Sequence, residues 1–285
     1  MDSVPAMRVV VNADDLGLNP AVRRAVETLA AAGTLSSASL LANGPDIEAA
    51  ARVSGIGLGV HLNVLRGAPL SRPAEVASLV GPDGLFPGDY ATLLLRWLSG
   101  RIDPAEVEAE WERQIGRVRE LGAVPTHLDS EKHVHAWPGL MRIAQRLARR
   151  HGIGWVRRPK ERIGPQGPRP GLARVAFLRL CALGHTALTV VRWPDEVFGI
   201  ADQGPRLTPQ AFARHCARRR PDVVEIVCNP GDPRPGDPPI PAGYGSLRVP
   251  GQWRAEFASL SDPAWRETFA RLGAELTHFG RLAGA

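Results

Sequence analysis

Short apolar runs alternate with longer segments of helical periodicity along the chain. The run "RVVVNA" (8–13) is brief and rich in β-branched residues, which predicts a central strand. Asn19 then suits a helix N-cap, Pro20 the first helical position, and Gly33 the end of a helix of about three and a half turns. Together these segments form one strand–helix unit.

The same alternation continues towards the C-terminus. Further strands are predicted in "GTLSSASLLA", "IGLGVHLNV", "VPTHLD", "IGWVRR" and "DVVEIVC", and further helices in "PDIEAAARV", 103–122, "PGLMRIAQRLARRHG" and 266–281. Near-continuous apolar strands separated by helices are typical of a parallel sheet covered by helices. We therefore predict an α/β fold, a distorted (β/α) barrel of seven or eight units, formed by residues 1–285 as a single domain.

Polar side chains stand where four of these strands end. Because the carboxyl ends of parallel strands meet at one rim, we expect these side chains to share one pocket. They are Asp14 and Asp15 after the first strand, His61 and Asn63 in "GVHLN", His127, Asp129 and Glu131 after "VPT", and Asn229 after "EIVC".

Each of these signals alone has an ordinary structural explanation. An aspartate pair can cap a helix, and a lone histidine in an apolar strand is more often a core residue than a ligand. The segment "THLDSEKHVH" (126–135) is different, because three histidines and three charged groups in ten residues suit neither a core nor a generic loop. His127 and Glu131 also lie four residues apart, a spacing that suits one divalent ion where the chain turns after a strand. We therefore predict a metal site.

The motifs "NADDLG", "GVHLN", "PTHLDS..HVH" and "EIVCNPG" resemble the successive motifs of the YdjC-like carbohydrate deacetylases over nearly the whole chain. This resemblance implies a deacetylase-type barrel, one divalent metal ion, and N-deacetylation of an N-acetylglucosamine-bearing substrate. By position, Asp14 would be the general base, and Asp15 and His61 would be metal ligands. Within the family the chain is most similar to the deacetylase associated with hopanoid biosynthesis, which implies an N-acetylglucosaminyl hopanoid glycolipid as substrate.

The chain departs from the family pattern at two positions. It has "LDSE" where members usually have "LDSH", so the third ligand would be Glu131, with His127 as the alternative nitrogen ligand. Glutamate shifts the preference from zinc towards magnesium or manganese. Asn229 replaces a histidine in "NPG"; its amide can donate a hydrogen bond to an oxyanion but cannot deliver a proton. His133 and His135 are then the candidates for a general acid.

The adjacent aspartates have a chemical interpretation. Amide hydrolysis needs a Lewis acid, a water nucleophile and a base. A cation bound by Asp15 would neutralise that carboxylate and leave Asp14 to accept a proton. Two alternatives stay open: a metal-dependent esterase or phosphoesterase, for which no glycine-rich phosphate loop is evident, and a non-catalytic sugar-binding relative that uses the same pocket.

Composition bears on the packing of the protein, its partners and its compartment. Hydrophobic residues make up 44% of the chain and charged residues 22%, which supports a packed core. The net charge of +6 comes mainly from arginine and fits either coding bias or an anionic partner such as a membrane, while no motif for nucleic acid is present. Three separated cysteines in apolar surroundings and an N-terminus without a secretory pattern predict a cytoplasmic protein. The sequence also leaves open whether the protein forms an oligomer.

The apolar segment at about 170–205 allows two interpretations. It is a helix that covers the barrel, or it is a lid or interfacial helix that admits a lipid tail while Arg174, Arg179 and Arg192 meet anionic headgroups. The second interpretation predicts peripheral contact with the inner face of a membrane. Its charged residues argue against a membrane-spanning helix.

Overall fold

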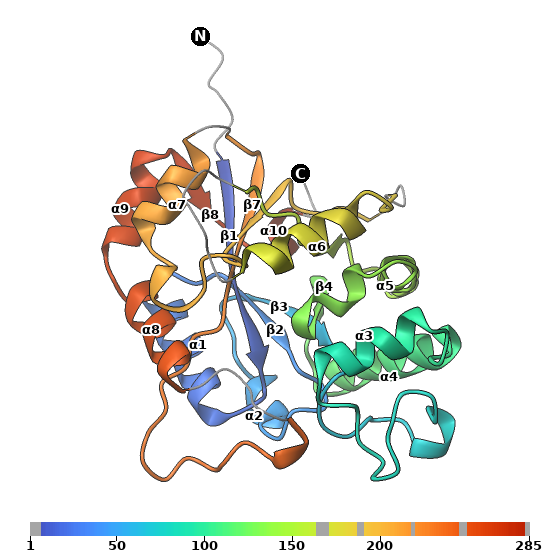
Figure 1. Ribbon diagram of the computed structural model, residues 1–285. Coiled ribbons are helices and arrows are strands. Elements are labelled where there is room, and N and C mark those ends of the chain that lie inside the picture. The colour runs from blue at the N-terminus through green and yellow to red at the C-terminus, as the bar shows by residue number, and fades with distance from the viewer. Residues whose placement is uncertain (1–6, 164–170, 187–190, 218–219, 245–249, 283–285) are drawn as a thin grey trace.

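All strand pairings that the structure describes are parallel. The computed structural model describes residues 7–163, 171–186, 191–217, 220–244 and 250–282 (Figure 1). Its strands are β1 (Met7–Leu16), β2 (Ser37–Leu40), β3 (Gly57–Leu62), β4 (His127–Ser130), β5 (Trp155–Val156), β6 (Glu196–Phe198), β7 (Val223–Cys228) and β8 (Ala274–Leu276). They form one sheet in the order β5-β4-β3-β2-β1-β7-β6, and β8 pairs with the beginning of β1.

The two ends of this strand order approach each other. An isolated parallel bridge joins Trp155 of β5 to Arg192, which precedes β6, and another joins Glu161, which follows β5, to Val197 of β6. The sheet therefore curls, as Figure 1 shows, and the prediction of a distorted (β/α) barrel is confirmed.

Helices surround the curled sheet. They are α1 (Pro20–Ala31), α2 (Ile47–Ala50), α3 (Tyr90–Leu98), α4 (Pro104–Glu120), α5 (Leu140–Arg150), α6 (Leu172–Ala182), α7 (Pro209–Cys216), α8 (Pro250–Leu260), α9 (Ala264–Arg271) and α10 (Phe279–Leu282), with 3-10 turns η1 (Pro73–Glu75), η2 (Glu131–Ala136), η3 (Gly204–Arg206) and η4 (Ala242–Tyr244). The predicted caps are confirmed: Asn19 accepts a hydrogen bond from the Ala21 amide, and Asp103 accepts one from the Ala105 amide.

The prediction of one terminal helix over 266–281 is wrong. Helix α9 ends at Arg271, and Gly273 has a φ of 58°, in the left-handed region that stops a helix. The chain then becomes β8, whose residues pair with Met7, Arg8 and Val9 of β1. The amphipathic spacing of the sequence did not reveal this strand, because only the free edge of β1 specifies it. Helices α3, α7 and α8 were not predicted, and the helix expected in "PDIEAAARV" is only the single turn α2.

Within the predicted segment 170–205 lie α6 and β6, while residues 170 and 187–190 fall outside the described residues. Helix α6 buries Val175, Leu178 and Cys181 against the protein and leaves Leu180 two-thirds exposed. One side of α6 thus packs against the protein, and its other side exposes apolar residues. Among the described residues, no helix is long and apolar enough to cross a bilayer.

Gly59 of β3 provides a test of how tightly the core is packed around His127. A Cβ at this position would lie 2.4 Å from Cε1 of the buried His127 ring. We expect Gly59→Ala to lower the free energy of unfolding by about 1–3 kcal/mol, because a filled core accepts extra atoms only by shifting its neighbours. Urea unfolding measures the change.

Gly116→Ala is the matched control for this substitution. Gly116 lies inside α4, and beyond the adjoining backbone of its own helix no atom lies within 4 Å of the added Cβ, so the same change should stabilise the protein by about 0.5–1 kcal/mol. Equal effects of the two substitutions would contradict the packing described for His127.

Candidate active site

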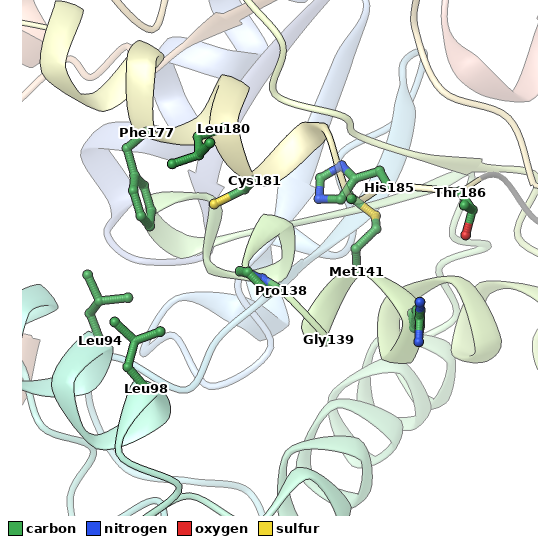
Figure 2. Close-up of a pocket in the computed structure, with 12 residues that line it drawn as sticks. Leu94, Leu98, Pro138, Gly139, Met141, Phe177, Leu180, Cys181, His185 and Thr186 are labelled. Carbon is green, nitrogen blue, oxygen red and sulfur yellow. The ribbon is translucent and has the colours of Figure 1, made fainter.

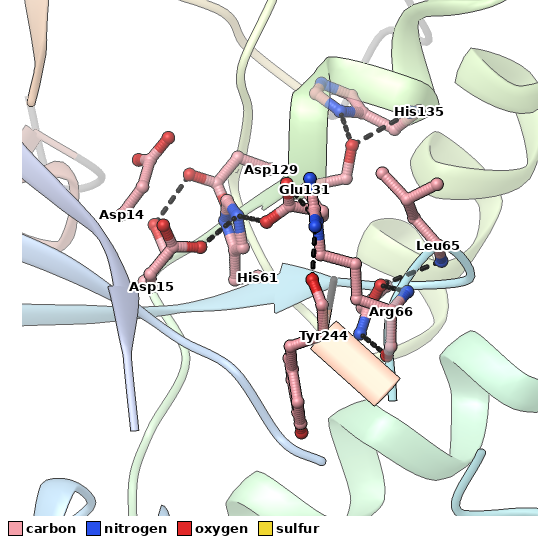
Figure 3. Close-up of polar contacts among 12 residues, drawn as sticks. Asp14, Asp15, His61, Leu65, Arg66, Asp129, Glu131, His135 and Tyr244 are labelled. Carbon is pink, nitrogen blue, oxygen red and sulfur yellow. Dashed lines mark hydrogen bonds and ion pairs between the residues drawn. The ribbon is translucent and has the colours of Figure 1, made fainter. Parts of the chain in front are cut away.

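Two neighbouring aspartates enter one site because strand β1 is bulged. Consecutive residues of a regular strand point to opposite faces. Between the pairs Ala13–Ala38 and Leu16–Leu40, however, β1 has one residue more than β2. Asp15 takes up the irregularity with a φ of 66°, rare for a residue other than glycine. Asp14 and Asp15 are both 3% exposed and lie near His61 (Figure 3).

His61, on β3, is held by one ring nitrogen and presents the other to two carboxylates. Its Nδ1 lies 2.8 Å from Oδ1 of Asp129. Its Nε2 lies 3.4 Å from Oδ1 of Asp15 and 3.8 Å from Oε2 of Glu131 (Figure 3). Burial opposes a charge on this ring, but Asp129 and Glu131 outweigh burial and raise the pKa of His61 well above its usual value. The arrangement is the one by which a carboxylate orients a metal-binding histidine.

The donor atoms of Asp15, His61 and Glu131 fit a divalent cation. They all lie within 4.8 Å of one another, and all three residues are buried. Ligand atoms about 2.0–2.1 Å from a tetrahedral ion are separated by about 3.3 Å, close to the 3.4 Å between His61 and Asp15. One nitrogen and two carboxylate oxygens form a donor set that binds zinc, manganese or magnesium.

A second group, Asp14, His61 and Asp129, meets the same distance criterion. Its carboxylates are already occupied by a guanidinium: Arg157 contacts both oxygens of Asp14 at 2.7 and 3.0 Å, and Oδ2 of Asp129 at 2.7 Å. The carboxylates of the first group are therefore the better candidates for binding a cation, and those of the second group surround and support them.

Arg157, directly after β5, links these supporting carboxylates. It is fully buried, and besides Asp14 and Asp129 it contacts Glu225 of β7, with Nε 2.9 Å from Oε1. Burial opposes the charged guanidinium, but Asp129, Asp14 and Glu225 together raise the pKa of Arg157 well above its usual value. Asn12 and Ser39 complete the cluster by donating to Asp14 and Asp129, respectively.

Glu131 opens the turn η2 and is held from the side opposite His61. Nε of Arg66 lies 3.3 Å from its Oε1, and Arg66 also donates to the backbone carbonyl of Tyr244 (Figure 3). The next two residues, Lys132 and His133, both have left-handed backbone conformations, with φ values of 52° and 59°. The turn is strained, as is common where a chain must direct side chains into a site.

The other predicted histidines have different surroundings. His127 belongs to neither group of donors: its ring packs on Phe279, with Nδ1 3.0 Å from Oγ1 of Thr126. Burial lowers the pKa of His127 to about 3. The predicted alternative of His127 as a ligand is thus not the arrangement found. His133 is buried in η2, two residues after Glu131.

His135 is anchored at both ring nitrogens. Nδ1 lies 2.6 Å from Oγ of Ser130, and Nε2 lies 2.7 Å from the carbonyl oxygen of Arg157. Burial lowers the pKa of His135 to about 3. A neutral ring that bridges η2 and the end of β5 serves to position Arg157, and it is poorly suited to donate a proton.

Asn229 follows β7 beside the aspartates. Cys228 pairs with Ala13, so Asn229 lies at the level of Asp14 on the neighbouring strand. Its backbone amide donates to Glu256, 2.5 Å away, which fixes the end of the strand. Both polar atoms of its side chain are buried and have no hydrogen-bond partner among the described residues. Such a group is costly unless a ligand satisfies it.

Sequence reasoning missed Arg157, Glu225 and Arg66 as parts of the site. Two of them left a signal. Glu225 is a charged residue inside the apolar run "VVEIVC", and Arg157 follows the short strand "WV" where a side chain should be buried. Arg66 left none, because its role depends on the fold of the loop after β3.

The fold and site together describe a parallel α/β barrel with a buried carboxylate–histidine cluster that could hold a divalent cation. The chain belongs to the family of YdjC-like proteins, whose model matches residues 8–271. This match confirms the predicted family, and relatives described as carbohydrate deacetylases confirm the prediction of an enzyme.

Proteins of similar sequence that are described as carbohydrate deacetylases support membership of this family. The chain is 30% identical to a mouse carbohydrate deacetylase over 95% of this chain and 94% of the relative. It is 30% identical to the human carbohydrate deacetylase over 96% and 90%, and 33% identical to that of Halalkalibacterium halodurans over 52% and 62%. A crystal structure from Enterococcus faecalis V583, of a proposed cellobiose-phosphate cleavage protein, matches with a TM-score of 0.74 at 22% identity, over 97% of this chain and 99% of the other, and shows the same fold.

Metal binding tests the assignment of ligands. We expect His61→Ala to weaken the binding of Zn²⁺ or Mn²⁺ by at least about 100-fold in calorimetry, because it removes the only nitrogen of the donor set. His127→Gln should leave the affinity within about threefold of the original protein, since this ring lies outside the donor set. A larger loss from His127→Gln than from His61→Ala would overturn the assignment.

The buried Glu225 makes stability depend on pH. Burial raises the pKa of Glu225 from 4.5 to about 7, against the opposing effect of Arg157. The folded protein thus keeps a proton that the unfolded chain loses, and stability falls as the pH rises through this interval. Relative to the original protein, Glu225→Gln should gain up to about 3 kcal/mol between pH 4.5 and pH 8.

Urea unfolding at a series of pH values, with a chelator present, measures this difference. Glu120→Gln, at an exposed position of α4, should show none of this pH dependence. A difference for Glu225→Gln that is flat over the whole range would contradict the role of burial.

Proposed function

We propose that the protein is a metal-dependent N-deacetylase that removes acetate from a carbohydrate bearing N-acetylglucosamine. One observation carries the proposal: His61, held by Asp129, faces Asp15 and Glu131, directly beside an aspartate clamped by Arg157. The mouse and human relatives, which align with almost the whole chain, are carbohydrate deacetylases and support the same reaction.

Asp15, His61 and Glu131 would hold the divalent cation. When bound there, such an ion acts as a Lewis acid on the carbonyl group and makes water a better nucleophile at neutral pH. Arg66 holds one oxygen of Glu131 and leaves the other directed towards His61, so Glu131 is arranged to bind through a single oxygen.

Asp14 is the proposed general base. Its carboxylate lies beside that of Asp15 because of the bulge in β1, and accepts the proton of the attacking water. Arg157 contacts both of its oxygens and so fixes the plane of the carboxylate. A base held in one orientation spends little entropy in reaching the transition state.

Asn229 is the proposed partner of the developing negative charge. The side-chain amide is buried, unpaired among the described residues and level with Asp14, so it can donate a hydrogen bond to the oxygen of the tetrahedral intermediate. Since His135 is anchored at both nitrogens, His133 remains our candidate for protonating the leaving amine.

The finer choice of substrate stays a prediction. The choice of an N-acetylglucosaminyl hopanoid glycolipid as the substrate is supported by the resemblance of the motifs. An assay for released acetate, with chito-oligosaccharides, this glycolipid, O-acetylated sugars and sugar phosphates as substrates and Mg²⁺, Mn²⁺ and Zn²⁺ as ions, distinguishes N-deacetylation from hydrolysis of esters or phosphoesters. Metal binding without turnover of any of these substrates would favour the sugar-binding alternative.

Substitution of the base tests the mechanism. We expect Asp14→Asn to lower kcat for acetate release by about 100-fold or more, because an amide cannot accept the proton of water. Metal affinity should stay within about threefold of the original protein, as Asp14 is not among the proposed ligands. Asp222→Asn, at an exposed position before β7, is the control. Undiminished turnover by Asp14→Asn would eliminate this residue as the base.

A further inference from the structure

Helices α3 and α6 border an apolar hollow on the outside of the barrel. The hollow has a volume of about 450 Å³, and its lining includes Leu94 and Leu98 of α3, Met141 of α5, and Phe177, Leu180 and Cys181 of α6 (Figure 2). None of the proposed metal ligands, nor Asp14 or Asn229, lines it. It is thus separate from the candidate active site.

Large apolar side chains stand exposed around this hollow. Leu98 is 65% exposed, Leu180 66% and Leu183 83%. Leu180 lines both this hollow and a second one, which Leu183 also lines, so the apolar surface continues along the end of α6. Single exposed leucines are common, but a group of them usually marks an interaction site.

Four cationic side chains surround these leucines. Arg142 borders the first hollow, and Arg158, Lys160 and Arg179 border the second. Within the described part of the chain none of the four forms an ion pair.

The contacts that these cations do make leave their charge uncompensated. Arg158 lies over the ring of Trp193 and donates to the carbonyl of Ala182. Arg179 donates to the backbone carbonyl of Glu161. The helices themselves add no carboxylate, because α3, α5 and α6 contain neither aspartate nor glutamate.

We propose that this α3–α6 surface, formed by Leu98, Leu180, Leu183 and the four cations, docks the protein on an anionic lipid bilayer. The leucines would enter the boundary between headgroups and acyl chains, and the hollow would accept part of an acyl chain. Each cation near the headgroup phosphates strengthens the attraction to an anionic surface. A protein with a net charge of +6 is also attracted to such a surface before contact.

The charge of the surface argues against a second copy of this chain as its occupant. In a symmetric dimer each surface meets itself, so the four cations of one copy would face those of the other without carboxylates between them. An anionic bilayer supplies the compensating charge. The inference goes beyond the proposed function and does not depend on it, because docking is measured without substrate.

Co-sedimentation of the full chain with vesicles tests the proposal. One set of vesicles is phosphatidylcholine alone, and the other is an equal mixture of phosphatidylcholine and phosphatidylglycerol. We expect binding to the anionic vesicles that falls as salt is added, and weak binding to phosphatidylcholine. The double substitution Leu180→Asp and Leu183→Asp should reduce the affinity by at least about 10-fold, because two apolar side chains no longer insert.

Val124→Asp is the matched control, because Val124 is 79% exposed but lies outside the α3–α6 surface, before β4. Circular dichroism and sedimentation velocity accompany each variant. Absent binding of the original protein, equal binding to both kinds of vesicle, or an equal loss for Val124→Asp would overturn the proposal. So would a dimer that the double substitution dissociates without any change in vesicle binding.

Discussion

The contact of Arg157 with three buried carboxylates is the interaction on which the site depends. Asp14, Asp129 and Glu225 come from β1, β4 and β7, and all three lie against one guanidinium. Without this cation, like charges would meet in a region that excludes water, at a cost of several kcal/mol for each uncompensated group. Asp129 in turn holds the ring of His61, which faces the other two proposed ligands, Asp15 and Glu131. The same guanidinium thus joins three strands, compensates their buried charges and, through Asp129, orients the proposed metal ligand His61.

The surroundings of the cluster are arranged to keep Arg157 in place. The ring of His135 donates from Nε2 to the carbonyl of Arg157 and shares a hydrogen bond with Ser130 through Nδ1, and so links the turn after β4 to the end of β5. On the opposite side of the site Arg66 contacts Glu131 and the backbone at Tyr244, which brings η4 towards the ligands. The two arginines therefore have different roles: Arg157 supports the proposed base and the carboxylate that orients His61, while Arg66 limits the rotation of a proposed ligand, Glu131.

Much of this arrangement was predictable because it follows strand ends. In a parallel sheet the carboxyl ends share a rim, so Asp15, His61 and Glu131 could be expected together from their positions in three predicted strands. Contacts that depend on loops and free edges could not be foreseen. Arg66 reaches Glu131 through the loop after β3, and β8 exists because the edge of β1 beside it accepts a partner. Periodicity reports the face that a segment buries, but not which neighbour it meets.

The irregular ladder of β1 has a consequence for how such a centre can change. A straight strand would send the two consecutive carboxylates to opposite sides, one into the interior packing and one into the pocket. Here a single extra residue and the left-handed backbone of Asp15 bring two adjacent carboxylates into one pocket, where they can take the two different roles proposed for them. The only residues between Ala13 and Leu16 are the two acids, so a deletion that restored a regular ladder there would also remove one of them. The number of residues in this part of β1 therefore matters to the site as much as the identity of its side chains does.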